Sequence, residues 1–289
     1  MKNTSWLDRE EYPFKSNFLQ LDMGRMLYID VGKGEPIVMF HGNPTWSFLY
    51  RHIVKGLSKK YRCIAMDYLG FGLSDKPSNW SYLPEDHAKN IQKLIEALDL
   101  KEITLIVQDW GGPIGLSYAI NNPNNVKRII IMNTWMWSIK GDSHFERFSK
   151  FLGGRFGRFL IMRLNFFVRV VMKLIIGDRS KLPKSIHRHY IMPLKNPKER
   201  IGCWVFPKEI IGSDDWVKSL WSLRKNIEDK PTLILWGMKD SAFREQELKK
   251  WEELFSNHKT VKFENVGHYV QEEIGNDLCP IIENFLSLE

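Results

Sequence analysis

Short apolar runs alternate with amphipathic segments along most of the chain. Runs rich in β-branched residues predict strands at 26–31, 36–40, 63–66, 103–107, 128–132, 232–235 and 260–263. Apolar residues at helical spacing predict helices at 47–57, 84–97, 112–121, 246–254 and 277–286. Because strands alternate with helices, we expect an α/β fold with a mostly parallel central sheet and helices on both faces.

The alternation stops between residues 133 and 229, where helical patterns occur without a good strand. This pattern predicts a helical cap, 133–229, inserted after the sixth strand. The core then consists of 1–132 and 230–289. A Gly153-Gly154 pair predicts a break between two helices of the cap.

The cap also contains an apolar stretch, 156–177, of bilayer-spanning length. Four basic residues interrupt it, and each charge near a bilayer centre costs roughly 2.5–3.5 kcal/mol. Arg158, Arg169 and Lys173 fall on one side of a helical projection. We therefore expect an amphipathic helix with a basic stripe, and no transmembrane segment.

Charge is concentrated in the same region. Residues 140–210 hold 16 Lys and Arg against 5 Asp and Glu, whereas the whole chain has a net charge of +8. The helical spacing favours a solvated basic face over apolar residues. Self-association and contact with an anionic surface stay open, and no pattern indicates nucleic-acid binding.

Composition excludes several classes of protein. With 43% hydrophobic residues and 11 Trp in 289 residues, the chain has enough apolar surface for a core and is not disordered. Cys63, Cys203 and Cys279 are too few and too scattered for a disulfide framework or a cysteine-rich metal site. No secretory signal is visible at the N-terminus, so we expect a cytoplasmic protein.

Candidate chemistry begins at Asp109. An apolar strand runs into Asp109-Trp110-Gly111-Gly112 and then a helix, which is typical of a nucleophile elbow. A carboxylate can attack carbon directly and form an ester. The alternative is that Asp109 only caps the following helix.

A second candidate loop, His41-Gly42-Asn43-Pro44, follows the strand 36–40. Its backbone N–H groups are expected beside the elbow, where hydrolases build an oxyanion hole. Asn43 is either a functional donor or a turn residue before Pro44. We assign His41 a structural role.

Three motifs together carry a family resemblance: His41-Gly42-Asn43-Pro44-Thr45, the segment 67–77, and Val107-Gln108-Asp109-Trp110-Gly111-Gly112. They resemble the α/β-hydrolase superfamily and, within it, the haloalkane dehalogenases. The resemblance covers the chain from about residue 20 to the end and is weakest across 140–225. It implies the α/β-hydrolase fold.

The resemblance also implies the roles of five residues. Asp109 is the expected nucleophile, His268 the base, and Asp240 the acid that orients His268. Asn43 and Trp110 are the expected halide-binding residues, and their backbone N–H groups form the oxyanion hole. The strand 128–132 ends in Asn133-Thr134-Trp135 without a carboxylate, so this chain resembles the subfamily with an Asp-His-Asp triad and an Asn-Trp halide site.

The expected reaction turns an uncharged haloalkane and water into an alcohol and a halide ion through an alkyl ester of Asp109. It needs no cofactor and no metal. An epoxide hydrolase with the same triad is the alternative, but that family uses paired cap tyrosines, and residues 133–229 contain only Tyr190. A more distant alternative is a non-catalytic binding protein on the same fold.

Overall fold

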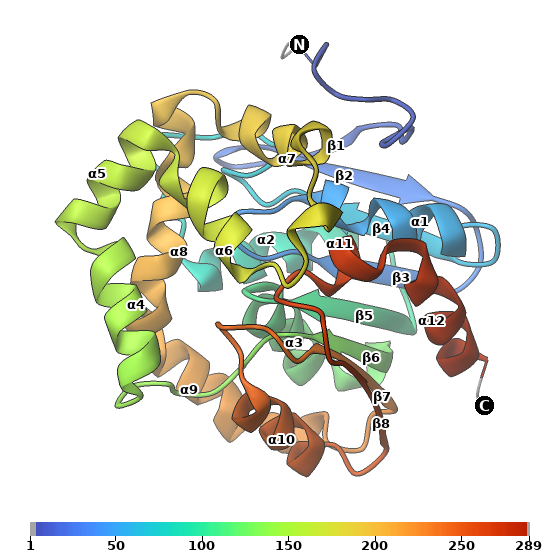
Figure 1. Ribbon diagram of the computed structural model, residues 1–289. Coiled ribbons are helices and arrows are strands. Elements are labelled where there is room, and N and C mark those ends of the chain that lie inside the picture. Colours follow the sequence, from blue (N-terminus) through green and yellow to red (C-terminus); the bar gives the residue numbers. More distant parts are fainter. Residues whose placement is uncertain (1–3, 288–289) are drawn as a thin grey trace.

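The fold is built on an eight-stranded sheet, seen in the computed structural model (Figure 1), which describes residues 4–287. The strands are β1 Asn17–Leu21, β2 Gly24–Val31, β3 Pro36–Phe40, β4 Arg62–Met66, β5 Ile103–Gln108, β6 Val126–Met132, β7 Thr232–Gly237 and β8 His258–Phe263. Their order is β1-β2-β4-β3-β5-β6-β7-β8. Only the β1–β2 and β2–β4 pairs are antiparallel, which confirms the predicted mostly parallel sheet.

All seven predicted strands are present, but β1 was not predicted. It lies at the edge of the sheet and pairs only with β2. Of its five side chains only that of Leu21 is buried, and Phe18 is exposed. An edge strand in contact with solvent needs no continuous apolar run, so the hydrophobic pattern did not mark it.

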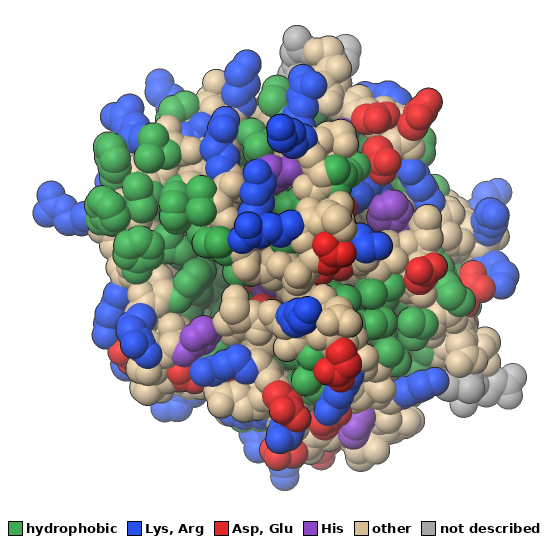
Figure 2. All heavy atoms as spheres, in the orientation of Figure 1, with side chains coloured by type: hydrophobic (Ala, Val, Ile, Leu, Met, Phe, Trp, Pro, Cys, Tyr) green, Lys and Arg blue, Asp and Glu red, His purple; other side chains and the backbone are tan. Residues whose placement is uncertain are grey.

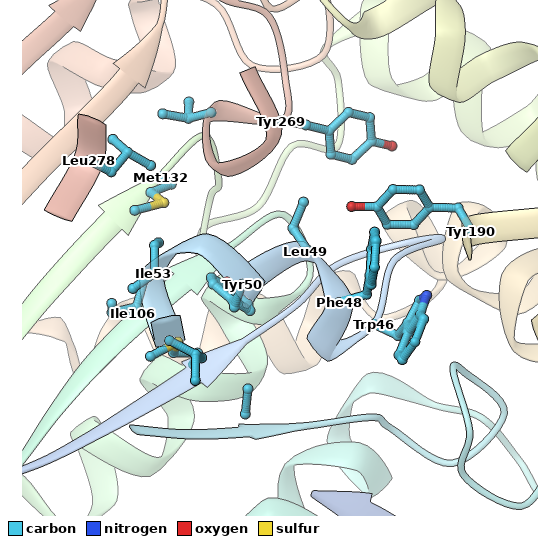
Figure 3. Packing of buried hydrophobic residues seen from close by; sticks show 14 of the residues in the cluster. Trp46, Phe48, Leu49, Tyr50, Ile53, Ile106, Met132, Tyr190, Tyr269 and Leu278 are labelled. Carbon is cyan, nitrogen blue, oxygen red and sulfur yellow. The ribbon is translucent and has the colours of Figure 1, made fainter. Parts of the chain in front are cut away.

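Helices cover both faces of the sheet. The α-helices are α1 Arg51–Leu57, α2 Pro84–Ala97, α3 Gly111–Asn121, α4 Ser143–Gly153, α5 Arg155–Leu164, α6 Met172–Ile175, α7 Lys184–Ile191, α8 Ile201–Gly212, α9 Asp214–Ser222, α10 Glu245–Leu254, α11 Val270–Ile274 and α12 Leu278–Leu286. Alternate residues of a strand face opposite layers: Ile37 and Met39 pack with α1 and α12, whereas Val38 and Phe40 pack with α2, α3 and α10. Figure 3 shows part of the first of these two cores.

Between β6 and β7 the described chain is helical, from α4 to α9 (Figure 1). The predicted break at Gly153-Gly154 separates α4 from α5. The last helix of the segment, α9, contacts α3 of the sheet-flanking layer. The end of the insertion therefore packs on the core.

The prediction of one amphipathic helix over 156–177 was wrong. The structure ends α5 at Leu164, and Asn165 adopts a left-handed conformation with φ 54°. The buried Asn165 amide donates to the carbonyl of Leu194 at 3.2 Å, which holds this break in place. A π-helical turn, Phe167–Val171, then leads into α6. Across residues 4–287, no helix is long and apolar enough to cross a membrane.

A buried ion pair joins three helices that are far apart in the sequence. The guanidinium of Arg51 in α1 donates to both carboxylate oxygens of Glu272 in α11, at 2.8 and 2.5 Å. The hydroxyl of Tyr190 in α7 donates to the same carboxylate at 2.5 Å. All three side chains are buried, so neither charge has water as an alternative partner.

We expect Glu272→Leu to lower the free energy of unfolding by about 3–5 kcal/mol, because it removes the buried carboxylate that accepts two hydrogen bonds from Arg51 and leaves only the half-buried Glu11, which accepts from Nε at 3.0 Å. Urea denaturation followed by circular dichroism measures this. The double variant Arg51→Met/Glu272→Leu is the control, since it removes both charges and should recover most of the loss. Equal losses in the single and double variants would show that packing, and not the uncompensated charge, is responsible.

Candidate active site

The turn between β5 and α3 places the Asp109 side chain above the sheet. Asp109 has a positive φ of 51°, which is costly for a residue with a side chain. Its backbone is fixed on both sides: its N–H donates to the carbonyl of Asn133 at 3.0 Å, and its carbonyl accepts from the N–H of Gly112 at 2.9 Å. The Thr134 hydroxyl donates to that carbonyl as well, at 2.5 Å. The predicted elbow is therefore present.

Three glycines make this turn sterically possible. A Cβ at Gly42 would overlap the Asp109 side chain, and a Cβ at Gly111 would overlap the backbone of Phe40. A Cβ at Gly112 would overlap the side chain of Thr134. Only glycine allows the loop after β3 to approach the elbow this closely.

The two carboxylate oxygens of Asp109 have different surroundings. Oδ1 accepts the backbone N–H of Asn43 at 2.7 Å, and the backbone N–H of Trp110 also hydrogen-bonds to the carboxylate. Oδ2 lies 3.6 Å from Nε2 of His268. Burial raises the pKa of the Asp109 carboxyl above its usual range, while His268 and the two backbone N–H groups oppose that shift.

His268 is held by Asp240, which follows β7. Nδ1 of His268 donates to Oδ2 of Asp240 at 2.8 Å. Burial lowers the pKa of the His268 imidazole, but Asp240 and the other nearby carboxylates together more than offset burial, so the pKa lies above its ordinary value. Asp109 contributes to this rise. Asp109, Asp240 and His268, which are far apart in the sequence, thus meet at the carboxyl ends of β5 and β7.

Two neighbours of this cluster were missed in the sequence. Asn133 donates its amide to Oδ2 of Asp240 at 2.9 Å and accepts the N–H of Gly237 at 2.8 Å. The amide nitrogen of Gln108 lies 2.9 Å from Nε2 of His268 and donates to the His268 carbonyl at 3.3 Å. Since Nδ1 of His268 carries the proton shared with Asp240, Nε2 accepts from Gln108.

His41 takes no part in this cluster. Its Nδ1 donates to the Gly42 carbonyl at 2.9 Å, and its Nε2 accepts the N–H of Tyr68 at 3.1 Å. Burial lowers the pKa of His41 to about 3, so the ring is neutral. Its contacts agree with the structural role expected for it.

A cavity of about 200 Å³ opens above Asp109. Asn43, Asp109, Trp110 and His268 all line it. The rest of the wall is largely apolar and includes Trp135, Ile139, Phe145, Phe148, Phe167, Ile175, Pro207, Ile210 and Phe243. The aromatic residues Trp137, Phe151, Trp204 and Phe206 of the insertion between β6 and β7 lie outside this wall.

The side chain of Asn43 also contacts the insertion. Its amide donates to the carbonyl of Cys203 in α8 at 3.2 Å. That carbonyl lacks the usual helical hydrogen bond, because the residue four positions on is Pro207, which has no N–H. One of the two amide hydrogens of Asn43 is thus used on α8, and the other is available to the cavity.

The comparisons with known proteins agree with this geometry. Residues 35–273 match the model of the alpha/beta hydrolase fold family. The chain is 36% identical over 282 residues to Haloalkane dehalogenase 2 of Mycobacterium tuberculosis, covering 96% of this chain and 97% of the relative. It is also 32% identical to a cis-3-alkyl-4-alkyloxetan-2-one decarboxylase of Shewanella oneidensis, covering 95% and 89%.

Solved structures show the same fold. A variant of haloalkane dehalogenase DatA from Agrobacterium tumefaciens superposes with a TM-score of 0.87, at 24% identity, over 98% of this chain and all of that one. The fold and the elbow define an α/β hydrolase, and with relatives of this similarity the chain belongs to the haloalkane dehalogenase family within it.

The hydrogen bond from Gln108 to His268 leads to a testable prediction about the pKa of the His268 ring. The Gln108 N–H stabilises the neutral imidazole, so we expect Gln108→Met to raise the pKa of His268 further. Titration of the His268 ring by nuclear magnetic resonance measures the change. Gln92→Met, on the exposed side of α2, is the matched control. An unchanged or lowered pKa would show that Gln108 does not donate to this ring.

Proposed function

We propose that this protein hydrolyses haloalkanes to an alcohol and a halide ion, with Asp109 as nucleophile. The observation that carries the proposal is a buried carboxylate in an apolar cavity, with an imidazole on one side and uncharged N–H donors on the other. An apolar wall favours uncharged substrates, since a charge buried there without a partner is costly. The relative from Mycobacterium tuberculosis supports the same activity.

In the first step, an oxygen of Asp109 displaces the halogen. Oδ1 is held by the backbone N–H of Asn43, whereas Oδ2 lies beside His268, so we take Oδ2 as the attacking oxygen. It forms a bond to the substrate carbon while the carbon–halogen bond breaks, and the electron pair leaves with the halide. The product of this step is an alkyl ester of Asp109.

The departing halide needs hydrogen-bond donors at the moment when its charge develops. The side-chain amide of Asn43 and the indole of Trp110 are uncharged donors in the cavity wall. Neutral donors stabilise the anion without holding it as a cation would. We assign both residues to halide binding.

In the second step, His268 takes a proton from water, and the hydroxide formed attacks the ester carbon of Asp109. The carbonyl oxygen, Oδ1, takes up the negative charge of the tetrahedral adduct and is already positioned at the N–H of Asn43. The carbonyl then re-forms as the bond to the alkyl oxygen breaks, His268 returns its proton to the leaving alkoxide, and the alcohol departs. The Asp109 carboxyl group loses its remaining proton to solvent, so the net products are the alcohol, the halide and one proton. Asp240 stabilises the imidazolium. Esterification also removes the Asp109 charge, which had helped to raise the pKa of His268, so the pKa of the ring falls when it acts as a base.

The geometry disfavours the epoxide hydrolase alternative. Opening an epoxide requires an acid that protonates the alkoxide. Tyr190 donates to Glu272 in the core, and no tyrosine is among the residues that line the cavity within 4–287.

The relative from Shewanella oneidensis supports a second candidate, decarboxylation of a cis-3-alkyl-4-alkyloxetan-2-one. This reaction converts the ring into an alkene and CO₂. Its substrate is also uncharged and apolar, so the same cavity accepts it on physical grounds.

We also propose that the protein is located in the cytoplasm. Cys63, Cys203 and Cys279 are all buried and unpaired, as is usual for proteins of a reducing compartment.

Product analysis tests the function directly. We expect halide release from short bromoalkanes and chloroalkanes, and none from Asp109→Asn, which keeps the shape of the nucleophile but removes its charge. An epoxide and a cis-3,4-dialkyloxetan-2-one are assayed in parallel for diol and for CO₂. CO₂ release without halide release would transfer the assignment to the second candidate.

A substitution at Asn43 distinguishes carbon–halogen cleavage from the hydrolysis of the ester. The side-chain amide of Asn43 acts on the leaving atom, so Asn43→Ala should slow carbon–halogen cleavage about a hundredfold, by analogy with the loss of one oxyanion-hole donor. Ester hydrolysis should change little, because the backbone N–H of residue 43 is kept. Single-turnover kinetics resolve the two steps, and thermal unfolding checks the lost contact with α8. Unchanged cleavage would leave Asn43 as a purely structural link.

A further inference from the structure

A hydrophobic area covers the outer side of α5 and α6. Large apolar side chains are exposed at Phe151, Phe156, Phe159, Leu164, Val170 and Leu174, which we call the cap patch. Phe156 is 62% exposed and Leu174 is 60% exposed. Figure 2 shows a hydrophobic area at the left of the molecule, over these helices, with Lys and Arg around it. Only two other large apolar side chains of the described chain are this exposed, Phe18 and Leu223.

The cap patch contradicts the expected solvated basic face. In α5 the buried positions are Gly157 and Ile161, while Phe156 and Phe159 point away from the protein together with Arg163. A solvated helix places polar residues on its outer side. Here aromatic and basic residues share that side, which is the composition of helices that lie in a membrane interface.

The charge of the segment that carries the cap patch is strongly positive. Residues 147–177 include seven Lys and Arg and no Asp or Glu. Arg155, Arg158 and Arg163, with Lys198, line a shallow surface hollow together with Phe159 and Met162. Guanidinium and ammonium groups beside exposed aromatic rings match the phosphates and acyl chains of an anionic lipid layer.

The cap patch also lies on the outer side of the cavity wall. Phe167 and Ile175 line the cavity, whereas Val170 and Leu174 of the same short segment are exposed. Phe148 lines the cavity, and Phe151, one helical turn further along α4, is exposed. A surface that contacts the cap patch is therefore separated from the cavity by a single layer of helix.

We propose that the cap patch docks on the surface of an anionic phospholipid bilayer, with the apolar side chains in the interface and the cations at the lipid phosphates. A second copy of the chain fits less well, because a two-fold contact through the same patch would bring the two sets of cations together. The docking needs no membrane-spanning helix and does not depend on which reaction the protein catalyses.

Vesicle flotation tests the proposal with the full-length protein. We expect binding to vesicles of phosphatidylcholine with 30% phosphatidylglycerol, little binding to phosphatidylcholine alone, and release by high salt. Phe156→Ser/Phe159→Ser/Leu174→Ser should reduce partitioning more than tenfold. Arg155→Gln/Arg163→Gln/Lys173→Gln should reduce it about a hundredfold, because each cation near an anionic surface contributes roughly fivefold.

Matched controls separate this surface from general charge and hydrophobicity. Lys33→Gln/Lys59→Gln/Lys262→Gln removes three exposed cations elsewhere, and Phe18→Ser/Leu223→Ser removes the other two exposed apolar side chains. Both should bind like the wild type, and all variants should keep the turnover of water-soluble substrates. Equal binding to neutral vesicles, or equal loss in the controls, would overturn the proposal. So would a wild-type dimer, detected by light scattering, that the cap-patch variants dissociate while no variant changes vesicle binding.

Discussion

The site depends on how closely two loop backbones approach each other at Asp109. The loop after β3 comes so near the elbow that Gly42 has no room for a Cβ, and Gly111 is equally close to Phe40. That approach brings the Asn43 N–H to Oδ1 of Asp109. The left-handed backbone at Asp109 then leaves Oδ2 facing His268. Because the parallel order β3-β5-β6-β7 ends all of these loops at one edge, the cluster is a consequence of the sheet.

The sequence predicted those parts of the site that carry a local signal. Asp109 lies between an apolar strand and a glycine-containing helix start, so its position could be inferred from the local pattern, whereas the role of Asp240 after a later strand was implied by the family resemblance. Gln108 and Asn133 had no such signal. Each is separated from its partner by more than a hundred residues in the sequence. From the sequence alone, each resembles an ordinary polar residue at the end of a strand. The break at Asn165 was missed for the same reason, since its amide bonds to Leu194 in another segment.

Asn43 connects the insertion to the chemistry. Pro207 removes an N–H from α8, so the carbonyl of Cys203 lacks its usual helical hydrogen bond, and the Asn43 amide donates to it instead. Pro207 itself lines the cavity. The residue that we assign to the halide therefore also fixes the position of α8 over the cavity. Movement of this helix and the orientation of the donor are physically coupled through a single hydrogen bond.

Charged side chains are distributed differently inside the cavity and on the outer surface of the cap helices. Asp109 is the only carboxylate among the residues that line the cavity within 4–287, and no Lys or Arg is among them. The cations of 147–177 are on the outside of the cap helices instead. A positive field attracts anions, and an uncharged haloalkane gains no long-range attraction from it. The basic surface therefore does not serve substrate capture by charge. The exposure of the neighbouring aromatic side chains to water is unfavourable. Contact with an anionic lipid surface explains both the cations and the exposed aromatic side chains.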